Sequence, residues 1–126
     1  MSTMELQHRQ GSVLIENGEL LGQGHIDYGA PRSFKVSIYR GRSVVSGNTL
    51  YVVQKVGLSS VEGETDRFNC TIVRKPAAVI QVLHSLRRDK TALYMPKASM
   101  LALEQASTIE PALWRAWEAY SVKSAL

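Results

Sequence analysis

Residues suited to nucleophilic catalysis occur at scattered positions in the sequence. Such catalysis needs a nucleophile, a base and an orienting group, and the candidates are Cys70, His25 or His84, and Asp27. Cys70 alternates with bulky apolar residues, which places its thiol on the apolar side of a strand. A structural cysteine is therefore the preferred interpretation. We predict no catalytic residue, and an enzyme that uses Cys70, His25 and Asp27 is only a third hypothesis.

Metal and cofactor sites have weak signals. His25 and Asp27 lie two residues apart and could share one side of a strand, but the sequence offers no third ligand beside them. The carboxylates of 62–66 fall in a loop without apolar support, which indicates a solvated loop rather than an acid–base pair. Gly22–Gly24 lacks the third glycine and the following helix of a dinucleotide-binding motif. We expect no metal and no cofactor.

Basic and aromatic side chains gather in the stretch 33–57 and just before it. Five basic residues and no acidic residue lie between Asp27 and Glu62. Single-stranded nucleic acid is bound by a positive groove with aromatic platforms, and each stacked base contributes roughly 1–3 kcal/mol. Strand alternation puts several of these side chains opposite the apolar ones, although an ordinary solvated face is the alternative. The candidate nucleic-acid-binding residues are Arg32, Lys35, Tyr39, Arg40, Arg42, Tyr51 and Lys55.

A second basic patch lies at both ends of the first predicted helix, after the last predicted strand. Its residues would interact well with the C-terminal end of a helix dipole and would aid solubility, and this reading is preferred over a binding site. The members of the patch are Arg74, Lys75, Arg87, Arg88 and Lys90.

The last helical segment holds both tryptophans of the chain. Trp114, Trp117 and Tyr120 are candidates for a protein interface, because Trp and Tyr are enriched at binding hot spots. Core packing is the alternative for at least one of the tryptophans, since each would bury a large apolar area.

Length and composition indicate one globular domain over residues 1–126, with 1–11 as a flexible arm. The apolar share of 44% and the charged share of 21% are ordinary for a folded chain, and the net charge of +4 permits contact with nucleic acid. One cysteine excludes an internal disulfide. No leader and no apolar run of roughly 18 residues is visible, so we expect a cytoplasmic protein without membrane contact.

Periodicity predicts strands first and helices last. The alternating runs 34–39, 50–56 and 67–74 indicate strands, and Asn17-Gly18 predicts a hairpin turn between strands near 12–16 and 19–28. Gly22–Gly24 predicts a bulge or bend. Apolar stripes and prolines indicate two to three helices over 76–89, 97–106 and 108–124, the last one starting after Ser107 or at Pro111.

This order predicts an α+β fold: an antiparallel sheet or small half-open β-barrel of about five to six strands over 12–74, followed by the helices. The function expected from the residues is a non-enzymatic binding or regulatory module that contacts a macromolecule, DNA or RNA first, through a basic sheet face. The alternative is a protein–protein adaptor or inhibitor, including a homodimer through the C-terminal Trp-bearing helix.

Overall fold

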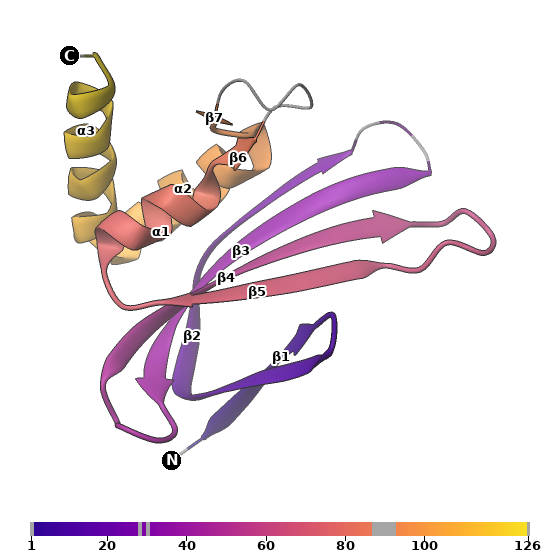
Figure 1. Ribbon diagram of the computed structural model, residues 1–126, viewed down its shortest axis with the longest axis horizontal. Coiled ribbons are helices and arrows are strands. Elements are labelled where there is room, and N and C mark those ends of the chain that lie inside the picture. Colours follow the sequence, from indigo (N-terminus) through magenta and orange to yellow (C-terminus); the bar gives the residue numbers. More distant parts are fainter. Residues whose placement is uncertain (1, 28, 30, 87–92, 126) are drawn as a thin grey trace.

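The computed structural model describes residues 2–27, 29, 31–86 and 93–125 and confirms the predicted α+β fold. Five antiparallel strands form a curled half-barrel in the order β1-β2-β3-β4-β5, and three helices follow (Figure 1). The strands of this sheet are β1 (Thr3–His8), β2 (Gly11–Asp27), β3 (Arg32–Ser43), β4 (Thr49–Ser59) and β5 (Arg67–Val73). The remaining elements are α1 (Pro76–Leu83), β6 (Ser85–Leu86), β7 (Leu93–Tyr94), α2 (Lys97–Ile109) and α3 (Pro111–Ala125).

The helix boundaries differ in part from the prediction. α1 ends at Leu83 instead of continuing to 89, because His84 is extended and Ser85 pairs with Tyr94 in a small hairpin; residues 87–89 lie outside the described residues. α2 extends beyond 106 to Ile109, and α3 begins at Pro111, the second of the two predicted starts. No helix in the described part of the chain has the length and apolar character needed to cross a membrane.

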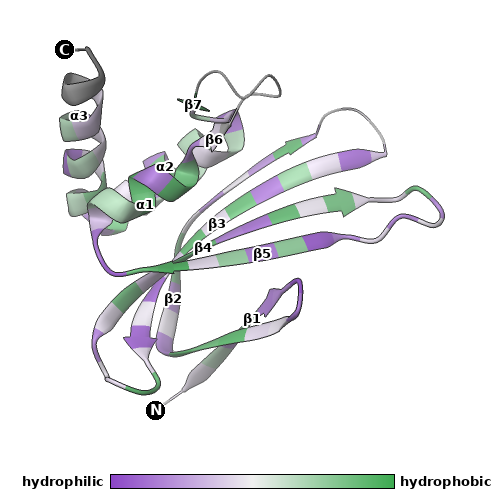
Figure 2. Cartoon of the chain, viewed as in Figure 1, coloured by the Kyte–Doolittle hydropathy of each residue, from purple (hydrophilic) through white to green (hydrophobic). Residues whose placement is uncertain are grey.

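Both sides of the sheet are covered, by different elements. Strands β3, β4 and β5 are banded with alternating hydrophobic and hydrophilic residues (Figure 2). On one side Val36, Ile38 and Val53 form the main core with the helices. On the other side Val52 packs with Leu6 of β1 and other residues of the N-terminal strands. A strand covered on both sides needs apolar residues at successive positions, and the run 50–53 is buried throughout.

The N-terminal residues form a strand, which corrects the expectation of a flexible arm over 1–11. β1 pairs with β2 from Thr3 to His8 and returns through a tight turn at Arg9-Gln10. Its end also reaches β5: the backbone N–H of Cys70 donates to His8 Nδ1 at 2.8 Å. The polar sequence hid the strand because its stability comes from pairing and from burial of Leu6, which is a tertiary effect.

Asn17-Gly18 is a bulge within one long strand, so the predicted hairpin turn at this position is wrong. The register of β2 against β3 shifts between Glu16 and Glu19, and Asn17 has a φ of 52°. Asn tolerates this left-handed conformation in a bulge as well as in a turn. The Asn17 N–H donates to the Ser2 carbonyl at 2.8 Å, which joins the bulge to the start of β1.

Helix α2 crosses β2 at very close range. A Cβ atom on Gly24 would lie 2.0 Å from the carbonyl oxygen of Ala98, and one on Gly22 would lie 2.2 Å from that of Ala102. Ala98, Ala102 and Ala106 are fully buried in the same core. A register shift between Leu20 and Gly22 confirms the predicted bulge, but the glycines serve mainly this approach of two backbones.

The same crossing closes an open edge of the sheet. Pairing with β1 stops at Glu16, and within the described residues no other strand pairs with the outer edge of the later part of β2. α2 lies along this edge, and the Gln105 side-chain oxygen accepts the N–H of Gln23 at 2.7 Å. Covering an edge with a helix removes a template for aggregation.

Gly24→Ala should destabilise the protein by about 2 kcal/mol or more, because the added methyl group overlaps a helix carbonyl that cannot move freely. Gly57→Ala in β4 is the matched control, since its Cβ would meet only Arg67 Cβ at 3.9 Å. Urea unfolding curves measure both free energies of unfolding. Equal stability of the two variants would disprove the close contact between α2 and β2.

Candidate nucleic-acid interface

The register divides the predicted basic face between the two sides of the sheet. Directly paired residues of antiparallel strands point to the same side. Tyr39 pairs with Val52, and Lys35 pairs with Val56. Tyr51 and Lys55 instead share the helix-covered side with their partners in β3. This corrects the expectation that these side chains all lie opposite the apolar ones, since Lys35 and Tyr39 lie on one side of the sheet and Tyr51 and Lys55 on the other.

Arg40 and Tyr51 of the sheet interact with a carboxylate at the junction of the helices. Arg40 forms ion pairs with Glu19 of β2 and with Glu110 between α2 and α3, each at 2.5 Å. The Tyr51 hydroxyl donates to Glu110 at 3.4 Å, and burial raises the pKa of this tyrosine. Both predicted binding residues are therefore engaged inside the protein.

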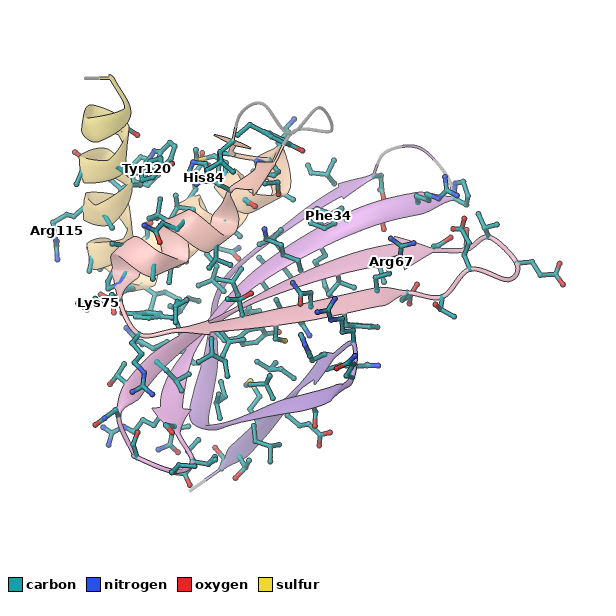
Figure 3. All side chains as sticks on the ribbon, in the orientation of Figure 1. Phe34, Arg67, Lys75, His84, Arg115 and Tyr120 are labelled. Carbon is teal, nitrogen blue, oxygen red and sulfur yellow. The ribbon has the colours of Figure 1, made fainter. Side chains whose placement is uncertain are left out.

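Lys55 is engaged beside the end of α1. Its ammonium group donates to the His84 carbonyl at 3.2 Å, and burial lowers its pKa. The ring of His84 in turn lies close to that of Tyr120 (Figure 3), at 4.7 Å from centroid to centroid. The centroid of the Trp117 ring lies 6.0 Å from that of His84. The Lys55 hydrogen bond thus connects β4 to the end of α1, and the ring contacts connect the end of α1 to α3.

The other predicted binding residues lie at different ends of β3. Arg42 is exposed near the β3–β4 turn and pairs across the strands with Thr49. Lys35 is half-buried on the side facing away from the helices, beside His25 of β2. Arg32 is exposed at the start of β3, far from Arg42 along the strand.

Arg32 lines a groove at the open end of the sheet. The groove has a volume of about 700 Å³ and lies between the ends of β3, β4 and β5 and the β6–β7 hairpin. Phe34 and Arg67 lie in this region in Figure 3, away from α3. Its lining includes the charged, aromatic and proline residues Arg32, Phe34, Glu64, Arg67, Tyr94 and Pro96.

An ion pair stands within the groove. Arg32 donates from Nε and Nη2 to separate carboxylate oxygens of Glu64, and Ser59 Oγ donates to the same carboxylate at 2.5 Å. Arg67 adds a further positive charge nearby. These contacts lower the pKa of Glu64 to about 2, with the Arg32 hydrogen bond as the largest cause.

The second basic patch is described only in part. Arg74 and Lys75 are exposed between β5 and α1, at the start of the helix (Figure 3). This is the N-terminal end of α1, whereas the helix dipole favours cations at the C-terminal end. Arg87, Arg88 and Lys90 lie outside the described residues.

The three candidate interface residues have different environments. Trp117 and Tyr120 pack against the main core, which agrees with the core-packing alternative. Trp114 is 36% exposed and lines a second groove, of about 460 Å³, between α2 and α3. Trp114 is thus the most exposed member of the set.

The residues considered for catalysis do not come together. His25 Nε2 lies 3.7 Å from Asp27 at an exposed strand end, whereas Cys70 contacts His8 and Gln7 of β1. Burial raises the pKa of the Cys70 thiol, which disfavours the thiolate nucleophile. Among the described residues, no three His, Cys, Asp or Glu side chains are grouped so that they could hold a metal ion.

Sequence reasoning missed most of the groove. Phe34 and Arg67 each begin a run that predicts a strand, and Glu64 lies in the predicted solvated loop. The signal that could have linked them was charge. The acidic loop 62–66 follows a long stretch in which every charged residue is basic, and opposite charges favour contact between the loop and that stretch. Tyr94 had no such signal.

Comparisons with known protein families, with curated proteins and with solved structures found no match. The groove is therefore interpreted from its own residues.

The Glu64 carboxyl should titrate near pH 2, well below its usual pKa of 4.5. Because folding lowers this pKa, the ion pair stabilises the native state above about pH 4.5 and loses that effect as the pH falls toward 2. Arg32→Gln should raise the pKa of Glu64. Carbon-detected NMR of the side-chain carboxyl measures both midpoints, and identical midpoints in the two proteins would rule out the Arg32–Glu64 pair.

Proposed function

We propose that the protein is a non-enzymatic binding module that holds single-stranded DNA or RNA in the groove at the open end of its sheet. The observation that supports this proposal is the combination of two arginines with two aromatic side chains around one groove: Arg32 and Arg67 with Phe34 and Tyr94. A basic groove with aromatic platforms is the usual arrangement for binding single strands.

Each kind of side chain has a separate role in this proposal. Arg67 is exposed on β5, where its guanidinium can bind phosphate oxygens. Tyr94 is 41% exposed, and Phe34 is half-buried against the core, so its ring is held by packing. Because the ring is already held in place, stacking a base on it costs the protein little conformational entropy.

The proposed module acts as an accessory or regulatory protein rather than a catalyst. The net charge of +4 favours an anionic partner, and phosphate contacts make such binding sensitive to salt. We place the protein in the cytoplasm, where its free cysteine, Cys70, would stay reduced.

Arg67→Gln should weaken binding of a fluorescent single-stranded oligonucleotide and lower the slope of log K against log salt by about 1. Arg115→Gln is the matched control, because Arg115 is exposed on α3 and points away from the sheet (Figure 3). Fluorescence anisotropy over a salt series measures both effects. Absence of binding by the unaltered protein at low salt, or equal losses in the two variants, would rule out this groove as the nucleic-acid site.

A protein–protein adaptor or inhibitor that forms a homodimer through the C-terminal helices is the second candidate function. The exposed ring of Trp114 beside an apolar groove favours it, since Trp is common at binding hot spots. Sedimentation equilibrium should then show a dimer, and Trp114→Ala should weaken its association. Trp117→Ala is a substitution in the core and should change the dimer only by lowering the stability of the fold. A strictly monomeric protein at high concentration would remove the homodimer.

A further inference from the structure

The anion position of the groove is already filled by a side chain of the protein. The two N–H groups of Arg32 and the hydroxyl of Ser59 converge on the Glu64 carboxylate. The charge of Arg67 acts on the same carboxylate. A strand phosphate that approaches these arginines must therefore compete with Glu64.

The chemistry of the incoming phosphate decides this competition. A phosphodiester has one negative charge, as a carboxylate does, so exchanging it for Glu64 gains little at Arg32. A terminal phosphate has a charge near −2 at neutral pH and three acceptor oxygens. Its oxygens can accept the hydrogen bonds from Arg32 and Ser59 that the Glu64 carboxylate now accepts, and its larger negative charge is favoured by the nearby charge of Arg67.

The dimensions of the groove agree with recognition of a strand end. A volume of about 700 Å³ is in the range of sites that accommodate one small ligand. The β6–β7 hairpin and Pro96 bound the groove on one side, and the loop that includes Glu64 bounds it on another.

The Glu64 side chain can leave without disturbing the sheet. Its loop has other anchors: the Ser59 N–H donates to Asp66 Oδ1 at 3.0 Å, and the Glu64 N–H donates to the Val61 carbonyl at 3.1 Å. The carboxylate itself is exposed, so it can rotate into water once an incoming anion takes over its hydrogen bonds from Arg32 and Ser59.

We propose that the groove selects strands with a terminal phosphate, and that this phosphate replaces the Glu64 carboxylate at Arg32 and Ser59. This inference rests on the proposed function. Glu64 then acts as an internal competitor that rejects the interior of a strand and yields to its phosphorylated end.

Anisotropy with three versions of one oligothymidylate of about ten nucleotides tests the inference. The versions have a 5′-phosphate, a 3′-phosphate or hydroxyl groups at both ends. Each is titrated with the unaltered protein, with Glu64→Gln and with Glu62→Gln. The last variant is the matched control, because Glu62 is an exposed residue of the same loop and its loss changes the net charge equally.

The unaltered protein should bind one or both phosphorylated versions at least about fivefold more tightly than the hydroxyl version. Glu64→Gln should tighten binding of the preferred version by about fivefold, and Glu62→Gln by much less. Equal affinity for all three versions, or equal effects of the two substitutions, would overturn the inference while binding itself still supports the proposed function. No binding by any of the proteins would remove both.

Discussion

The contact between the backbones of β2 and α2 is the constraint on which the rest of the structure depends. Gly22 and Gly24 leave no space for a side chain, and the alanines of α2 fit against them. This contact fixes α2 along the open edge of β2, and α3 follows directly from α2. Pro96, immediately before α2, is part of the groove wall. The position of this part of the groove wall thus depends on the contact between small residues of β2 and α2.

Several basic groups that the sequence suggests for binding hold the fold together. Arg40 joins β2 to the α2–α3 junction through two carboxylates, and Lys55 binds the carbonyl at the end of α1. Partly buried cations of this kind must be paired with oxygen atoms, because an unpaired charge away from water is costly. The arginines of the groove differ, since they lie at the surface where an external anion can reach them.

The alternation of β3, β4 and β5 and the stripe of α1 were predictable because local periodicity reflects burial directly. β1 and the Asn17 bulge were not, since one polar strand and one Asn-Gly pair have the same local appearance in a loop, a turn or a bulge. The placement of the basic and aromatic side chains on the sheet was wrong because a shift of one residue between β3 and β4 exchanges the two sides. The groove depends on the hairpin after α1 meeting the strand ends, which no local pattern specifies.

The central claim is that the end groove is the surface that receives a nucleic-acid strand. Mapping of backbone amide NMR shifts during titration with a 5′-phosphorylated single-stranded oligonucleotide tests it most directly. We predict that the largest changes fall at Arg32, Ser59, Arg67 and Tyr94, with little change at Arg42 or Trp114. Changes centred on Arg42, on Arg74 and Lys75, or on Trp114, with the groove unaffected, would contradict the account.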